Sequence, residues 1–319
     1  MAQQSATAQP APPSKGPVVW LEMDQQQLDD AYDQEKYAPN RAQIVARRIA
    51  NSERTRSIIG APQRMAYGPS EVETLDIFPT ARPNAPVNIF IHGGAWRRNQ
   101  AADYAVQAEL FVRAGAVSVI LDFINVDEAG GSLLPMAKQV RRAIAWVYRN
   151  VATFGGDPDR LHLTGHSSGS HLGACALTTD WGEEKLPANI IKGALLLSGM
   201  YDLKPVRLSK RSLYVEFTDD MEKLLSPQRY LDKLNTPLVL AYGTCETPEF
   251  QRQTRDLFAA LTAAGKPAQL LVGEGYNHFE LLETLASPYG VAGRAQLRQM
   301  GLVHADFCPP LSAGRHPEA

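Results

Sequence analysis

The sequence has few cysteines, no long hydrophobic run and no excess of charge of either sign. Cys175, Cys245 and Cys308 are too few and too scattered for a disulfide framework or a zinc site, which favours a reducing compartment. No apolar run approaches the ~20 residues that a membrane-spanning helix needs. The 32 Lys and Arg residues are balanced by 34 Asp and Glu residues, so there is no basic surface for nucleic acid or anionic membranes. We therefore expect a cytoplasmic protein with neither a nucleic-acid nor a membrane partner.

The composition that is present fits a globular chain with a sizeable core. Of the 319 residues, 44% are hydrophobic and 21% are charged, as in ordinary soluble domains. Residues 1–17 are rich in Gln, Ala, Pro and Ser without an apolar segment, which predicts a disordered tail and not a signal peptide. Residues 303–319 predict an irregular second tail. One domain is therefore expected over residues 18–302.

Residues 18–60 form a polar segment with helical patterns. Asp24 can cap a helix that runs through Tyr32, and residues 41–54 form a second charged helical stretch. Two interpretations remain open for this segment: solvated surface helices, or part of a lid over a cleft.

From residue 64 onwards, short apolar strands alternate with amphipathic helices. This alternation predicts an α/β fold with a mostly parallel sheet covered by helices on both faces. The irregular stretch 201–236 is expected to form a cap-like insertion over the carboxyl ends of the strands. The expected strands are 73–78, 87–92, 116–122, 160–164, 191–198, 237–243 and 268–272, and the expected helices are 101–114, 132–151, 171–178 and 250–264.

The strongest local signal is the sequence Gly-His-Ser-Ser-Gly at residues 165–169, between an expected strand and an Ala-rich helix. A serine on such a turn adopts a strained backbone conformation that presents its hydroxyl above the sheet. Gly165 and Gly169 suit this turn because side chains there would collide. We interpret Ser167 as a nucleophile.

A second glycine-rich element, His-Gly-Gly-Ala-Trp at residues 92–96, ends an upstream strand. Attack on a carbonyl group creates an oxyanion that backbone N–H groups can stabilise. The amides of Gly93 and Gly94 are candidate donors, together with the amide of Ser168 after the nucleophile. His92 is interpreted as a structural residue that braces the loop.

A serine nucleophile needs a base, and in this architecture the base follows the nucleophile in the chain. The downstream histidines are His171, His278, His304 and His316. His171 lies in the helix directly after the nucleophile, and the last two lie in the C-terminal tail. His278 follows the last expected strand through a loop, which favours it as the base.

The acid that orients the base is expected after the strand 237–243. Glu246 is our choice, and Glu249 is the reserve because it is expected to open the next helix. Neighbouring Cys245 is interpreted as a small buried residue without a redox role.

Four blocks together resemble a known family. They read HGGAW (92–96), GHSSGSHL (165–172), LSGMYDL (197–203) and YGxxETPEFxxQ (242–253). The chain resembles the α/β-hydrolases of the kynurenine formamidase (arylformamidase) and related esterase branch, from about Leu21 to Leu302. The resemblance implies an α/β-hydrolase fold and a hydrolase without metal or cofactor that acts on N-formyl anilides, such as N-formylkynurenine, or on esters. Dimers are common in that branch, so a homodimer is an open expectation.

Three features depart from the pattern of this branch. The acid is usually Asp and is Glu246 here, and residues 123–128 and 214–221 differ from the usual loops. Because both loops are expected to line the pocket, a carboxylesterase for short-acyl, aryl or carbamate-like esters stays open as an alternative. A non-catalytic ligand-binding relative is the other alternative, although no member of the expected triad is missing from the sequence. We expect an aromatic or apolar substrate, with pocket walls from Trp96, Phe123, Asn125, Tyr214, Phe217 and Phe279.

Overall fold

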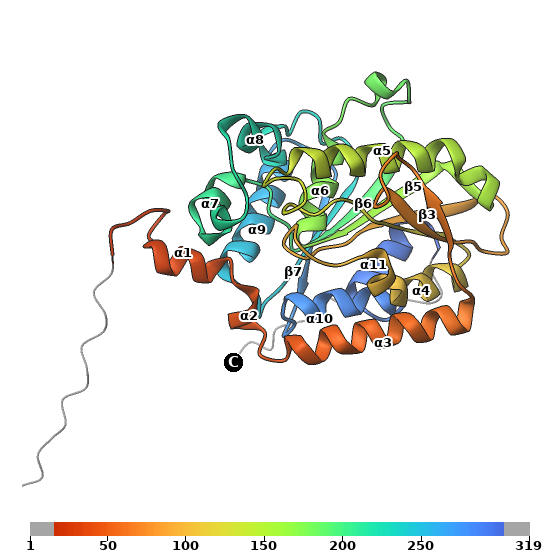
Figure 1. The fold of residues 1–319 in the computed structure, drawn as a ribbon, viewed down its shortest axis with the longest axis horizontal. Coiled ribbons are helices and arrows are strands. Elements are labelled where there is room, and N and C mark those ends of the chain that lie inside the picture. Colours follow the sequence, from red (N-terminus) through yellow and green to blue (C-terminus); the bar gives the residue numbers. More distant parts are fainter. Residues whose placement is uncertain (1–15, 303–319) are drawn as a thin grey trace, which may run out of the picture.

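A computed structural model describes residues 16–302 (Figure 1). The sequence-based expectations for residues 1–15 and 303–319 lie outside these residues. The chain forms an eight-stranded sheet in the order β1-β2-β4-β3-β5-β6-β7-β8. β2 is antiparallel to β1 and β4, and the remaining neighbours are parallel. The strands are β1 (Gln63–Ala66), β2 (Thr74–Phe78), β3 (Ala85–Ile91), β4 (Val117–Leu121), β5 (Gly156–His166), β6 (Ile191–Leu197), β7 (Leu238–Gly243) and β8 (Ala268–Gly273).

The sheet is buried on both faces because its apolar residues alternate between two hydrophobic layers. In β6, Ala194 and Leu196 belong to one layer, and Leu195 and Leu197 belong to the other. The helices α5 (Leu134–Asn150), α6 (Ser168–Leu177) and α9 (Pro248–Ala263) cover the first layer. The 3₁₀ helix η1 (Ala101–Gln107) and the helices α4 (Ala108–Arg113), α10 (His278–Glu283) and α11 (Val291–Gln299) cover the second (Figure 1). The expected α/β architecture is confirmed.

The register of the parallel strands brings their carboxyl ends to one edge of the sheet. Ile91 pairs with Gly165, and Leu197 pairs with Ala241. The loops that follow β3, β5, β6 and β7 therefore start beside one another. In open α/β sheets this edge is where ligands bind.

The N-terminal helices pack on the outside of this framework. They are α1 (Gln25–Ala31), α2 (Gln34–Tyr37) and the long α3 (Arg41–Ile59). α3 lies along η1, where Ser52 Oγ donates to the Asp103 carbonyl and accepts from the Val106 amide. α1 contacts α7 and α9, so the segment reaches from one side of the sheet edge to the other (Figure 1).

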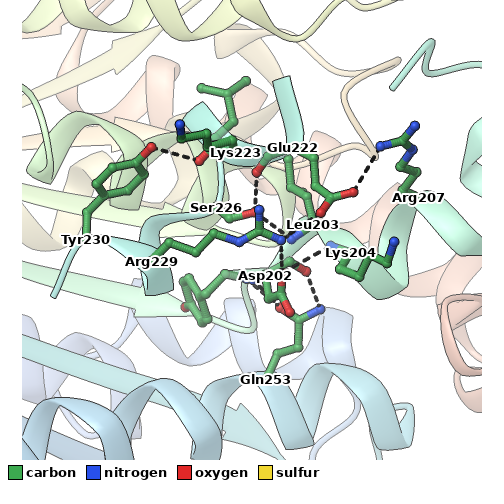
Figure 2. Close-up of polar contacts among 12 residues, drawn as sticks. Asp202, Leu203, Lys204, Arg207, Glu222, Lys223, Ser226, Arg229, Tyr230 and Gln253 are labelled. Atoms are coloured by element: carbon green, nitrogen blue, oxygen red, sulfur yellow. Dashed lines mark hydrogen bonds and ion pairs between the residues drawn. The ribbon is translucent and has the colours of Figure 1, made fainter. Parts of the chain in front are cut away.

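The stretch between β6 and β7 contains α7 (Leu203–Leu208), η4 (Lys210–Leu213), α8 (Asp219–Leu224) and η5 (Pro227–Arg229). Polar contacts hold it together and fix it to α9 (Figure 2). Gln253 of α9 accepts from the amides of Tyr201 and Asp202. The Glu222 carboxylate pairs with both Arg207 and Arg229. The insertion is therefore an ordered part of the described chain.

Several elements were not expected from the sequence. β1 is an edge strand whose residues are mostly exposed, so it lacks the apolar alternation that marks a strand. The helices α10 and α11 were missed, and the expected helix 101–114 is divided between η1 and α4. No helix within residues 16–302 is long and apolar enough to cross a membrane.

Candidate active site

Ser167 lies on the sharp turn between β5 and α6. Its φ of 57° lies in the left-handed region, which non-glycine residues rarely adopt. The glycines on either side permit the turn. A Cβ at Gly165 would lie 2.7 Å from the Gly169 carbonyl oxygen, and a Cβ at Gly169 would lie 2.1 Å from that of Ile91. The strained turn expected around Ser167 is therefore present.

His278 forms a close pair with Glu246. The His278 Nδ1 lies 2.7 Å from the Glu246 Oε2, and both side chains are buried. The other carboxylate oxygen, Oε1, accepts from the Gly243 amide at 2.7 Å and from the Ser198 hydroxyl at 2.5 Å. Gln34 Nε2 adds a longer contact of 3.3 Å to Oε2. These donors compensate the free-energy cost of burying the carboxylate, and they hold it against the imidazole.

The reserve acid, Glu249, is engaged elsewhere. It lies on α9, where it forms a bidentate pair with Arg252 and accepts from the Tyr32 hydroxyl at 2.9 Å. Burial, followed by the charge of Glu249, raises the pKa of Tyr32 well above its usual value, so the phenol stays protonated as a donor. The structure thus pairs Glu246, and not Glu249, with His278.

The expectation that Cys245 is buried is wrong, because its side chain is exposed. The loop after β7 makes a tight turn in which the Glu246 amide donates to the Gly243 carbonyl. This turn directs Glu246 inward and leaves its neighbour Cys245 at the surface.

Three other buried histidines lie around the site, and one of them, His166, also lines the cavity that contains Ser167 and His278. His166 Nε2 donates to the His278 carbonyl at 2.9 Å, and burial, followed by the nearby His278, lowers the pKa of His166 well below its usual value. His171 donates from Nε2 to the Leu225 carbonyl, and burial lowers its pKa to about 4. His92 stacks on an aromatic ring at 4.4 Å, as expected for a brace of its loop. Within residues 16–302, His278 is the histidine held at hydrogen-bond distance from a carboxylate.

The glycines after β3 lie directly against the nucleophile turn. A Cβ at Gly93 would lie 2.9 Å from Ser167 Cβ, and Gly94 has a φ of +121° that favours glycine. Ser168 begins α6, so its amide has no acceptor within the helix. The Ser168 hydroxyl accepts from the Trp96 amide at 3.2 Å, which joins the two loops. The three candidate oxyanion residues therefore belong to one cluster.

Ser167 and His278 open into a cavity of about 350 Å³. Much of its wall comes from the N-terminal segment, including Tyr32, Gln34 and Arg48. Gln34 is buried and also contacts the Thr247 amide beside the acid. The segment therefore contributes to the wall of the cleft, and its interpretation as part of a lid stays a prediction.

Two of the six predicted pocket residues, Tyr214 and Phe279, line the cavity. The other four, Trp96, Phe123, Asn125 and Phe217, are not among its lining residues. Trp96 is buried and donates from its indole to His171, and Phe123 stacks on His92. Phe217 packs against the core, and the Asn125 side chain accepts from the Glu128 amide. The aromatic side chains of Trp96, Phe123 and Phe217 therefore pack inside the protein and do not form the cavity wall.

The sequence reasoning missed the charged residues of the cavity. Arg41 and Arg48 of α3, Arg97 and Arg98 after β3, and Lys210 and Arg211 of the insertion all line it. Arg41 and Arg48 are seven positions apart on one helix, which places them on the same face. That spacing was the one signal in the sequence that could have indicated them.

The mostly parallel eight-stranded sheet, with a serine on the turn after β5 and a His–carboxylate pair from later loops, defines an α/β-hydrolase. A family described as BD-FAE matches residues 75–194. A kynurenine formamidase from Danio rerio is 28% identical over 88% of this chain and 98% of its own length. One from Salmo salar is 30% identical over 78% of this chain and 85% of its own. The chain belongs to the kynurenine formamidase and carboxylesterase branch of the α/β-hydrolases.

Solved structures agree with this fold. A putative thioesterase from Silicibacter sp. TM1040 has a TM-score of 0.70 at 22% identity, covering 83% of this chain and 96% of its own. An esterase from Thermogutta terrifontis has a TM-score of 0.60 at 20% identity, covering 80% of this chain and 96% of its own. At these identities the likeness concerns the fold alone. The relatives in sequence identify the chain as a hydrolase of the formamidase or carboxylesterase type.

Proposed function

We propose that this hydrolase cleaves an N-formyl anilide such as N-formylkynurenine through an acyl-enzyme on Ser167. The observation that carries the proposal is the 2.7 Å contact between His278 Nδ1 and Glu246 Oε2, in a cavity that Ser167 shares with His278. A serine nucleophile, an imidazole base and a buried carboxylate that orients the base are the groups that nucleophilic acyl transfer needs. No metal or cofactor takes part in the proposed reaction.

In the proposed mechanism each group has its own role. Because Nδ1 donates to Glu246, the neutral imidazole carries its proton there and keeps Nε2 free to accept one. Ser167 Oγ attacks the carbonyl carbon as its proton passes to Nε2. The proton then moves to the leaving nitrogen as the C–N bond breaks, which leaves the acyl group on Ser167. A water molecule, activated by the same imidazole, releases the acid.

The charge that develops on the carbonyl oxygen needs its own donors. The amides of Gly93, Gly94 and Ser168 are proposed for this role, since the loop after β3 lies against the Ser167 turn. Each aligned donor contributes about 3 kcal/mol to stabilisation of such a transition state.

An aromatic substrate is also part of the proposal. Tyr32, Tyr104, Tyr214 and Phe279 line the cavity and offer ring faces to an anilide. A cytoplasmic site of action is supported by the free thiols of Cys175 and Cys245.

A carboxylesterase is the second candidate, because the relatives also include an isoprenylcysteine α-carbonyl methylesterase from Arabidopsis thaliana at 27% identity. That alignment covers 56% of the methylesterase, compared with 98% of the Danio rerio formamidase. The fuller correspondence favours the formamidase. The third alternative, a non-catalytic protein that only binds a ligand, is not favoured, because Ser167, Glu246 and His278 are all present.

The two candidates differ in the leaving group. An anilide nitrogen must be protonated by His278 before it leaves, whereas a phenolate leaves unaided. We expect hydrolysis of N-formylkynurenine with a kcat/KM at least equal to that for short p-nitrophenyl esters, and loss of both activities in Ser167→Ala. A strong preference for the esters would replace the formamidase with the carboxylesterase, and full activity in Ser167→Ala would contradict both.

A further inference from the structure

The loop that carries the candidate oxyanion glycines is held in a conformation that its residues disfavour. Gly94 has a φ of 121°, and the next two residues, Ala95 and Trp96, have φ values of 56° and 63°. Residues other than glycine rarely adopt the left-handed region, and two in succession persist only where their surroundings hold them. The loop therefore needs fixed partners if its backbone amides are to keep their positions.

Trp96 has such partners for both its backbone and its side chain. Its amide donates to the Ser168 hydroxyl oxygen at 3.2 Å, and its carbonyl accepts from the Val126 amide at 2.8 Å. The indole Nε1 donates to His171 Nδ1 at 3.2 Å. Trp96 and His171 are both buried, so water does not compete for this bond. The indole bond is therefore a buried link between the glycine loop and α6.

The second ring nitrogen of His171 determines which tautomer is present. Nε2 lies 2.8 Å from the Leu225 carbonyl oxygen, which can only accept, so Nε2 carries the proton. In the neutral ring Nδ1 is then a lone pair, which is what the Trp96 indole needs as an acceptor. Leu225 belongs to the insertion between β6 and β7, so the insertion fixes the orientation of the ring.

His171 has no direct access to the substrate. It is fully buried and is not among the residues that line the cavity of Ser167 and His278. Both of its ring nitrogens already have partners within the described part of the chain. Any effect of His171 on the reaction must therefore pass through the groups that it holds, and of these Trp96 is two residues from Gly94.

We propose that His171 is a positioning residue of the oxyanion site, because its Nδ1 lone pair holds the Trp96 indole and so keeps the strained loop in place. The amides of Gly93 and Gly94 then stay where the negative charge of the transition state develops. The inference rests on the proposed hydrolase function and adds to it a residue that acts from outside the cavity. Catalytic donors lose much of their effect when they are displaced by about 1 Å, so loss of the Nδ1 acceptor should lower kcat by about 10- to 100-fold while substrate binding stays the same.

Two amide substitutions separate the two bonds of the imidazole. In His171→Asn the amide oxygen takes the place of Nδ1 and keeps an acceptor for Trp96, whereas in His171→Gln the amide nitrogen takes the place of Nε2 and keeps a donor for Leu225. With 4-nitrophenyl acetate, His171→Gln and His171→Leu should show the fall in kcat with KM within about twofold of the wild type. His171→Asn should retain most of the wild-type kcat. Equal kcat values in the Asn and Gln variants would overturn the proposal.

A pair of inhibitors reports on the oxyanion site separately from the rest of the cavity. 2,2,2-Trifluoroacetophenone forms a tetrahedral adduct with a reactive serine, and its oxygen then carries the negative charge, whereas acetophenone stays trigonal and neutral. His171→Leu should weaken inhibition by the trifluoro compound by the same factor as kcat and leave inhibition by acetophenone unchanged. Equal weakening of both inhibitors would show that the cavity itself has changed, and would overturn the assignment to the oxyanion site.

Trp96→Phe tests the same bond from its other end, since it removes the indole donor and keeps an aromatic ring. It should lower kcat as His171→Leu does, and the double variant should lower it no further, because both substitutions break one bond. Losses that multiply in the double variant would overturn the proposal. Trp146→Phe is the matched control, because Trp146 of α5 packs against Phe154 and does not line the cavity. An equal fall in kcat for this control would show a general effect of losing an indole, and would also overturn it.

Failure of this inference and failure of the proposed function give different results. Turnover in Ser167→Ala would overturn the hydrolase function itself. If Ser167→Ala is inactive while the His171 and Trp96 variants keep the wild-type kcat and lose only free energy of unfolding, the function stands and the positioning role is overturned. If no His171 variant folds, the comparison of Trp96→Phe with Trp146→Phe decides the question.

Discussion

Glu246 and His278 are 32 positions apart in the sequence, yet their side chains meet at 2.7 Å. The contact is made where the loops after β7 and β8 lie side by side, since these strands pair in register up to Gly243 and Gly273. The sheet register therefore determines the relative position of acid and base. The extra methylene of Glu compared with Asp is accommodated because the Gly243 amide and the Ser198 hydroxyl hold the far oxygen.

Glu246→Gln tests the role of this carboxylate. The amide removes the negative charge that stabilises the imidazolium and leaves the base in a wrong tautomer, so kcat should fall by about 10³- to 10⁴-fold. Steady-state kinetics measure the change. Glu249→Gln is the comparison, since Glu249 bonds to Arg252 and Tyr32 and not to the base. An equal fall in kcat for both variants would contradict the assignment.

Gln34→Leu tests whether the N-terminal segment positions the acid. Gln34 Nε2 donates to the same Glu246 oxygen that binds His278. Loss of one hydrogen bond to a charged group costs about 1.5 to 3 kcal/mol, so kcat should fall about tenfold or more.

Gln26→Leu is the control for this prediction, because Gln26 is an exposed residue of α1 whose side chain bonds to Asp30. It should leave kcat unchanged. If Gln34→Leu lowers the free energy of unfolding and leaves kcat unchanged, Gln34 has a purely structural role.

Gly169→Ala should destabilise the nucleophile turn. The new Cβ would lie 2.1 Å from the Ile91 carbonyl oxygen, so β3 or α6 would have to move. We expect a loss of about 3 kcal/mol in the free energy of unfolding, measured in urea. Gly130→Ala is the control, since a Cβ there meets no atom within 4 Å and its φ of +63° costs only about 1 to 2 kcal/mol. Equal losses would contradict the close approach at Gly169.

His171 predicts a pH dependence of stability. Burial lowers its pKa in the folded chain from 6.5 to about 4, so the unfolded chain binds more protons between these values. The free energy of unfolding should therefore fall as the pH falls from 6.5 towards 4, by about 3 kcal/mol for this group. Urea unfolding at a series of pH values measures the slope. His171→Gln should flatten it, and an unchanged slope would show that His171 is not responsible.

The local motifs predicted side chains that the structure brings close together, whereas four of the six predicted wall residues do not line the cavity. The turn at Ser167 and the glycine loop at residues 93–94 are encoded in a few consecutive residues, because strain and close approach restrict the amino acids that fit. The choice of His278 and Glu246 followed from the chain order of strands and loops. Trp96 was wrongly predicted to line the pocket, because an aromatic side chain after a strand can point either into the core or towards the cleft.

The cavity residues that could not be predicted from the sequence come from segments that are in contact only in the folded chain. Arg48 of α3 and Arg211 of the insertion are 163 positions apart, but both line the same cavity. From the sequence alone, Arg48 and Arg211 would each be predicted to be an ordinary charged residue at the surface. Only the packing of α3 on η1 and of the insertion on α9 shows that both guanidinium groups are buried.

Labelling with a fluorophosphonate tests the central claim most directly. The reagent forms a stable adduct with a serine that a neighbouring base activates. Peptide mass spectrometry should find one adduct, on Ser167, with a labelling rate at least 100-fold lower in His278→Ala. Labelling at another residue, or an unchanged rate in His278→Ala, would contradict the account.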